Sequence, residues 1–204
     1  MKAYIDPPVR TPFALRFGTW IAERKTGKPM LVARILGWYP KAALGAGVME
    51  SLVAHSEGMA TARLLTLVRM QVSFMASCPF CIDMNSAEYT VSGISEAEIE
   101  VLQQRRGLDG AESLSREEKL ALRYARALTA TPVRIEPGLL RDLLATFSER
   151  ELVVLASTIA QVNFWTRMIQ GLGVPPAGFS ESCGVLHLED YTTLDAGVGA
   201  SEDA

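Results

Sequence analysis

Residues 66–88 read TLVRMQVSFMASCPFCIDMNSAE, a helical apolar pattern that runs into two cysteines three positions apart. Pro79 suits the first position of a helix, because the N–H that proline lacks has no partner there. We therefore predict that Cys78 caps a helix and that Cys81 lies in its first turn. The partial positive charge and free N–H groups of a helix N-terminus favour thiolate, the reactive form of cysteine. Residues three apart share a helix face, so the two sulfurs can meet as a reversible disulfide.

The cysteine pair has two other interpretations. The side chains can pack as small buried hydrophobes, or they can form half of a zinc site. Zinc needs two further ligands, and Cys183, His55 and His187 show no paired ligand spacing. Three cysteines are also odd in number, which excludes a disulfide framework. The proline after Cys78 favours redox use of the pair, with no bound metal or cofactor.

The rest of the chain is helical by pattern. Three capping boxes, each a Ser followed three residues later by Glu, mark helix starts: Ser95 with Glu98, Ser115 with Glu118, and Ser148 with Glu151. Apolar residues recur at helical spacing, and no strand pattern competes. We predict a single all-α bundle, with a helical domain at residues 41–173. An N-terminal extension at 1–40, with one short helix near 14–25, packs on it, and 174–204 form a C-terminal segment and tail.

Composition and charge restrict the partners. With 204 residues, 49% hydrophobic and 21% charged, the chain suits one folded domain. The net charge is -3 and no basic run is present, so we expect no nucleic-acid partner. The N-terminus lacks the apolar run of a signal peptide. Polar residues interrupt the apolar segment at 152–165, so we expect no membrane span. The expected compartment is the cytoplasm, where thiols are kept reduced.

Taken together, these motifs resemble the alkyl hydroperoxidase D-like / carboxymuconolactone decarboxylase superfamily, and its peroxidase-related branch in particular. The likeness lies in residues 66–88, in Gly93 with the cap SEAEI at 95–99, and in IAQVNFWTR at 159–167. It covers about residues 41–173. The resemblance implies an all-helical fold that assembles as a homo-oligomer, a trimer or hexamer.

The resemblance also implies roles for the two cysteines. In the peroxidase branch the second cysteine of the motif attacks the peroxide, and the first converts the resulting sulfenic acid into a disulfide. Cys81 is then the attacking thiol and Cys78 the resolving one, which agrees with the need of a sulfenic acid for a nearby thiol. The substrate is a small molecule, a hydroperoxide in the peroxidase branch. An external dithiol reductant restores both thiols.

The sequence departs from the family at the proton relay. The relay Glu lies twelve residues before the first cysteine and the relay His four after the second; these positions hold Thr66 and Asn85. Neither takes up a proton at neutral pH, although Asn85 can still hydrogen-bond a sulfur or a water. Arg69, on the helix face of Thr66, is a candidate to stabilise a thiolate by charge. His55 and Glu57, just before the next expected helix, are candidates for the missing base.

Three functions follow from these observations. The first is a thiol-dependent peroxidase or disulfide reductase. The second is a non-redox enzyme of the family, a decarboxylase or isomerase acting on a small lactone or cyclic acid, which the missing relay favours. The third is a non-catalytic oligomeric binding protein. The apolar helix also carries the polar or amphipathic residues Asn163, Trp165 and Arg167. They line a pocket or a subunit contact, or they are polar residues of the core whose hydrogen bonds are satisfied.

Overall fold

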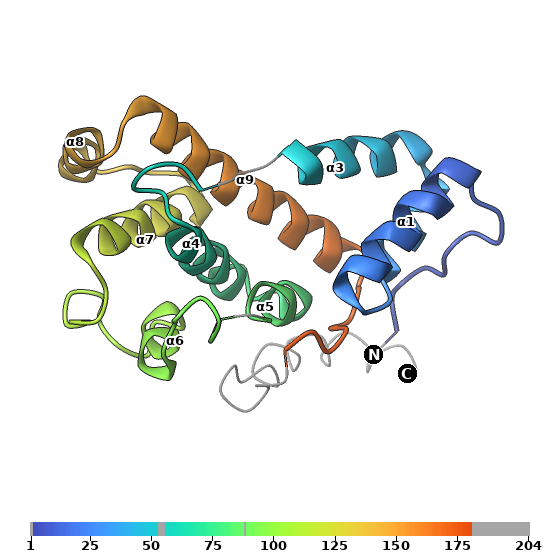
Figure 1. Ribbon diagram of the computed structural model, residues 1–204, viewed down its shortest axis with the longest axis horizontal. Coiled ribbons are helices and arrows are strands. Elements are labelled where there is room, and N and C mark those ends of the chain that lie inside the picture. Colours follow the sequence, from blue (N-terminus) through green and yellow to red (C-terminus); the bar gives the residue numbers. More distant parts are fainter. Residues whose placement is uncertain (1, 53–55, 88, 181–204) are drawn as a thin grey trace, which may run out of the picture.

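A computed structural model describes residues 2–52, 56–87 and 89–180 of the chain (Figure 1). The helices are α1 (Phe13–Thr26), α2 (Leu31–Ile35), the short 3₁₀ helix η1 (Leu36–Trp38), α3 (Pro40–Leu52), α4 (Ala62–Met75), α5 (Pro79–Asn85), α6 (Glu96–Leu102), α7 (Arg116–Thr129), α8 (Pro137–Thr146) and α9 (Glu149–Gly171). No sheet forms among the described residues, whose one extended pairing is the bridge between Glu57 and Ala60. The prediction of an all-α fold is confirmed.

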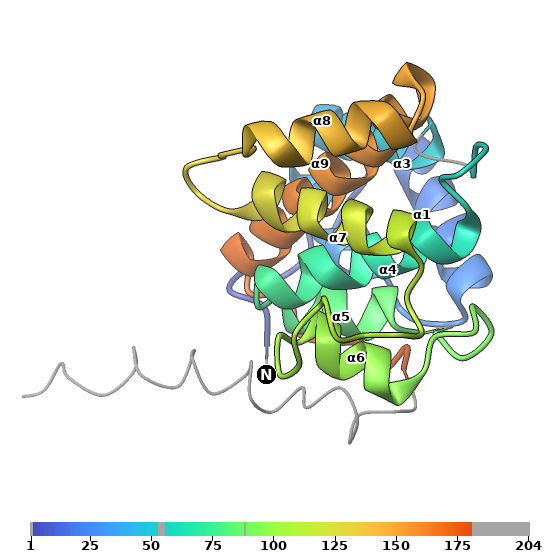
Figure 2. The same ribbon diagram turned by 90° about the vertical axis from the view of Figure 1, so that its left-hand side faces the viewer.

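The central helix is α4, which packs against α5, α7 and α9. Its buried side chains run along most of its length, from Leu64 to Phe74, and they contribute to the two larger apolar clusters of the protein. Figure 2 shows α7 between α8 and α4, with α5 and α6 on the far side of α4. Because α4 is held on several sides, the turn that follows it and helix α5 have a fixed position relative to the core.

The three predicted capping boxes are confirmed. In each, the Ser hydroxyl accepts the backbone N–H of the Glu, and the Glu carboxylate accepts the backbone N–H of the Ser. Arg63 connects two of them, because its Nη2 lies 2.7 Å from Glu98 Oε1 and its Nε lies 2.8 Å from Glu118 Oε1. The starts of α6 and α7 are thus tied to the start of α4.

The N-terminal part of the chain touches the core at a few points only. The helix predicted near residues 14–25 is α1, and none of its residues is buried. In contrast, Ala3, Val32 and Ile35 are buried, and the Tyr4 N–H donates to the carbonyl of Leu172 at 3.0 Å. Figure 1 shows α1 and α3 together at one side of the molecule, away from α7 and α8.

Helix α9 is long and apolar enough, by length and composition, to cross a membrane. It packs against α4, α5 and α7. Leu155, Ile159 and Val162 are buried in the apolar cluster that α9 shares with α4 and α7. The packing of α9 against α4 and α7 accounts for the apolar side chains that this helix buries.

Candidate thiol site

The turn from α4 into α5 presents the two cysteines. Ser77 has φ 49°, in the left-handed region, and the Cys78 N–H donates back to the carbonyl of Ser73 at 3.2 Å. Cys78 is the N-cap of α5 and Pro79 holds the first helical position, as predicted. The sulfur of Cys78 accepts the backbone N–H of Cys81 at 3.3 Å. A hydrogen bond of this kind stabilises a thiolate more than a thiol.

The two sulfurs are joined as a disulfide, and the Cα atoms of Cys78 and Cys81 lie 5.2 Å apart. Both side chains are buried, with Cys78 0% and Cys81 3% exposed. They belong to an apolar cluster, which we call the cysteine cluster. Its other buried members are Ala3, Val32, Ile35, Phe80, Ile169 and Val174, and Met84, Trp165, Leu172 and Phe179 are among the partly buried side chains against it. A small molecule in solution therefore reaches the sulfurs only when part of this cover moves.

The start of the C-terminal segment forms part of that cover. Asp83, two positions after Cys81, is fully buried. Its carboxylate accepts the backbone N–H groups of Ala177 at 3.0 Å, Gly178 at 2.7 Å and Ser180 at 2.7 Å. The ring of Phe179 also meets the ring of Phe80 edge to face, with centroids 5.8 Å apart. Residues 177–180 are thus fastened onto the helix that carries Cys81.

The side chains at the two relay positions direct their hydrogen bonds to α4. The Thr66 hydroxyl donates to the carbonyl of Ala62 at 3.0 Å, one turn back in its own helix. The Asn85 amide donates to the hydroxyl of Ser73 at 2.9 Å, and that hydroxyl donates to the carbonyl of Arg69 at 2.8 Å. Asn85 therefore fastens the end of α5 to α4.

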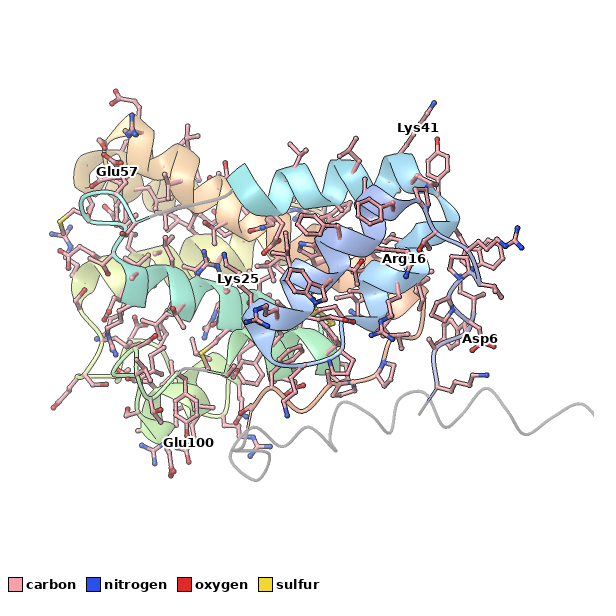
Figure 3. All side chains as sticks on the ribbon, turned by 45° about the vertical axis from the view of Figure 1, so that its right-hand side comes forward. Asp6, Arg16, Lys25, Lys41, Glu57 and Glu100 are labelled. Carbon is pink, nitrogen blue, oxygen red and sulfur yellow. A yellow bond between two sulfur atoms is a disulfide. The ribbon has the colours of Figure 1, made fainter. Side chains whose placement is uncertain are left out.

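The other candidate residues lie in different surroundings. Burial lowers the pKa of Arg69, and the negative charge of Glu50 opposes this shift. Glu57 forms an ion pair with Arg150 at 3.1 Å and lies at the end of the molecule where α9 begins (Figure 3). Helix α4, with 14 residues, spans about 20 Å between the loop of Glu57 and the turn before Cys78. His55 lies outside the described residues.

A carboxylate that the sequence analysis did not single out binds Trp165, a side chain that packs against the cysteine cluster. Glu50, near the end of α3, accepts the side-chain N–H of Gln161 at 2.6 Å and the indole N–H of Trp165 at 2.9 Å. The sequence signal was present in part, because polar residues in the apolar helix required partners. Asn163 finds its partners elsewhere, in the hydroxyl of Thr129 and a carbonyl of α9.

Within residues 2–52, 56–87 and 89–180, no group of three or more His, Cys, Asp or Glu side chains is placed to bind a metal ion. Cys183 and His187 lie beyond these ranges.

The fold and the helix-capping cysteine pair define a class of small all-α proteins with a Cys-x-x-Cys site. No protein-family model matches the sequence. Among curated proteins, the chain is 26% identical to the uncharacterized protein YnjA of Escherichia coli over 175 residues, which are 85% of this chain and 94% of YnjA. It is 30% identical to the uncharacterized protein YdfG of Bacillus subtilis over 126 residues, which are 61% of this chain and 82% of YdfG.

Solved structures give the same fold. A peroxidase-related protein of Ralstonia eutropha with an alkylhydroperoxidase AhpD core superimposes with a TM-score of 0.69 at 16% identity, covering 85% of this chain and 92% of that one. For the debrominase Bmp8 the TM-score is 0.71 at 17% identity, with 92% and 98% covered. A protein of unknown function from Agrobacterium tumefaciens, whose name proposes an antioxidant defence protein AhpD, gives a TM-score of 0.60 at 24% identity, covering 69% of this chain and 94% of that one.

The chain belongs to the family of YdfG. Its fold is that of the alkylhydroperoxidase AhpD core, so the fold that the sequence resemblance implied is confirmed.

Proposed function

We propose that this protein is a thiol-dependent oxidoreductase, a peroxidase or disulfide reductase, whose redox centre is the pair Cys78 and Cys81. The observation that carries the proposal is the geometry of the pair. The two sulfurs lie within bonding reach at the start of α5, inside an apolar cluster. Names of proteins with the same fold, peroxidase-related and antioxidant, agree with this chemistry.

The proposed cycle uses both sulfurs. The thiolate of Cys81 attacks the outer oxygen of a hydroperoxide, the O–O bond breaks, and the alkoxide takes a proton and leaves as the alcohol. Cys81 is then a sulfenic acid. The thiol of Cys78 attacks its sulfur, which forms the disulfide and releases water. An external dithiol reduces this disulfide by exchange and is itself oxidised to a disulfide. The two cysteine thiols thus supply both electrons that the reduction of the peroxide requires.

The assignment of the two roles rests on the family resemblance, because exposure does not separate the two cysteines, which are both buried. The N–H donated to the sulfur of Cys78 favours the thiolate of that residue, which suits attack on the sulfenic acid. We propose further that the substrate is a small hydroperoxide, and that the protein works in the cytoplasm as a homo-oligomer.

Peroxide consumption with dithiothreitol as the reductant tests the proposal. The wild-type protein and Cys183→Ser should consume peroxide at the same rate. Cys81→Ser should lose turnover, and Cys78→Ser should turn over only as fast as dithiothreitol itself reduces the sulfenic acid of Cys81. A Cys81→Ser rate equal to that of the wild type would sink the proposal.

A second candidate function uses the same thiols on a different substrate. The debrominase Bmp8 shares the fold, and a cysteine-to-alanine variant of it was solved with 2,3,4-tribromopyrrole. In this chain, two thiols would supply two electrons and a proton that replace bromine on the ring, so that bromide leaves and the disulfide forms. Bromide release from a bromopyrrole by the reduced protein, lost in Cys81→Ser, would favour this reaction over peroxide reduction.

A further inference from the structure

Three helices meet at the carboxylate of Glu50. Gln161 and Trp165, one turn apart on α9, both donate to the same oxygen, Oε2 of Glu50, at 2.6 and 2.9 Å. Arg69 of α4 lies close enough for the charge of Glu50 to act on its pKa. Hydrogen bonds to a charged group are stronger than those between neutral groups. The bond from the indole therefore fixes the side chain of Trp165 relative to α3, and the bond from Gln161 holds the same carboxylate oxygen in place.

Trp165 connects this carboxylate to the cysteines. Its ring packs against the cysteine cluster, which contains Cys78 and Cys81, while its N–H points to Glu50. The ring also meets Phe164 edge to face at 5.3 Å between centroids. Trp165 thus packs its apolar ring against the cysteine cluster and donates its polar N–H to an exposed acid.

We propose that Glu50 is a positioning residue of the thiol site, which holds the Trp165 indole against the cysteine cluster and so sets the access of small molecules to the two sulfurs. The inference rests on the proposed function of the cysteine pair, and it deepens that function by naming the wall that a substrate must pass. Glu50 itself is exposed and lies on α3, outside the two larger apolar clusters, so its replacement should leave the fold intact.

Alkylation of the reduced protein by iodoacetamide tests this inference without a substrate. In a Cys183→Ser background, Glu50→Ala should alkylate at residues 78 and 81 about tenfold faster, the factor that matches the loss of a hydrogen bond to a charged group. Glu50→Gln retains an acceptor for the indole and should stay within about threefold of the parent. The matched control is Glu100→Ala, which removes an acid of α6 that is paired with Arg106. This change should not alter the alkylation rate.

A double-mutant cycle separates positioning from general loosening. Trp165→Phe keeps an apolar ring but removes the N–H, so it should speed alkylation as Glu50→Ala does. The double variant should then be no faster than the faster single variant, because both changes break one interaction. Additive effects, or an alkylation rate of Glu50→Ala equal to that of its parent, overturn the inference. Equal thermal unfolding of the variants shows that the fold is retained.

The two proposals fail in different ways. Absence of peroxide or bromide turnover in the wild-type protein counts against the proposed function, whereas the alkylation rates do not depend on turnover. Alkylation depends on access and on the thiolate fraction, and Glu50→Gln removes the same charge as Glu50→Ala while it keeps the hydrogen-bond acceptor. Coupled alkylation rates for Glu50 and Trp165 support the positioning role whatever substrate the pair reduces.

Discussion

Single residues in this protein have roles that their spacing alone does not reveal. Cys78 and Cys81 look equivalent in the motif, yet one sulfur accepts a backbone N–H and the other belongs to the donating residue. Asp83 follows two positions later and has a structural contact instead: its carboxylate accepts three backbone N–H groups of residues 177–180. The proposed redox pair and the anchor of residues 177–180 therefore lie within two residues of each other on one short helix.

The two cysteines should differ in the intermediate that they leave. In a Cys183→Ser background, we expect Cys78→Ser treated with one equivalent of hydrogen peroxide to hold a sulfenic acid at Cys81, because the chain then has no second thiol to condense with it. Dimedone labelling followed by peptide mass spectrometry checks this. Cys81→Ser is the control, and a label on Cys78 in that variant but none on Cys81 in the first would reverse the assigned roles.

Loss of the buried charge at residue 83 should loosen the C-terminal segment. In Asp83→Asn the amide NH₂ replaces an acceptor that faces N–H donors, so we expect a destabilisation of about 3 kcal/mol. Urea unfolding gives this number, and limited proteolysis should cut near residues 177–180 faster. Asp142→Asn, an exposed position on α8, is the control. Unchanged protection of the segment would contradict its anchoring by Asp83.

At the scale of helices, the capping boxes do more than start α6 and α7. Glu98 is almost fully buried at 2% exposed, and Arg63 is its ion-pair partner. Arg63 also donates to the carbonyl of Gly93, in the loop before α6. One arginine at the start of α4 thus links two helix N-termini and a loop.

We expect Arg63→Met to destabilise the protein by about 3 kcal/mol, because a buried carboxylate is left without its partner. Chemical denaturation measures the loss. The double variant Arg63→Met with Glu98→Gln should recover part of it, since the unpaired charge is then removed. A loss below about 1 kcal/mol would place this pair with ordinary surface ion pairs.

The same pair gives a pH dependence. Burial alone would raise the pKa of Glu98, but hydrogen bonds from Ser95 and the charge of Arg63 outweigh it and hold the pKa below its usual value. A lowered folded-state pKa stabilises the protein above the ordinary Glu value of about 4.3, and this contribution is lost as pH falls through the lowered value. Unfolding free energy measured from pH 6 downward should therefore fall less steeply in Arg63→Met than in the wild type.

The sequence predicted these local features well and the distant ones poorly. A capping box is complete within four residues, and Pro79 fixes the start of α5 from its own position, so both could be read directly. The contacts of Glu50 with α9 join residues 111 and 115 positions apart, and those of Asp83 span 94 to 97 positions. Polar residues in apolar helices signalled that such partners exist, but only the packing of α3 and α9 selects them.

At the scale of the whole molecule, helix α1 contacts α2 and α3 but buries none of its own residues. Phe13, Phe17 and Trp20 stack along one face of α1 at 6.5 and 5.8 Å between centroids and are 81%, 52% and 52% exposed. Trp38, Tyr39, Leu44 and Val48, in η1, α3 and the residue between them, are exposed as well. We call these exposed apolar side chains the aromatic patch.

We expect a second copy of this chain to cover that patch, in keeping with the proposed homo-oligomer. Trp20→Glu places a charge in the stacked row and should shift the assembly to a smaller species, with little effect on the bundle of α4, α7 and α9. Sedimentation velocity measures the shift, and Val91→Glu, an exposed apolar position before α6, is the control. A wild-type protein that sediments as a monomer at all concentrations would contradict the expectation.

The central claim is that Cys78 and Cys81 form one redox unit. Thiol titration of the reduced protein before and after one equivalent of hydrogen peroxide tests it most directly. We predict that two of the three thiols disappear together, that dithiothreitol restores both, and that peptide mapping finds residues 78 and 81 joined. Loss of a single thiol, or of none, would contradict the account.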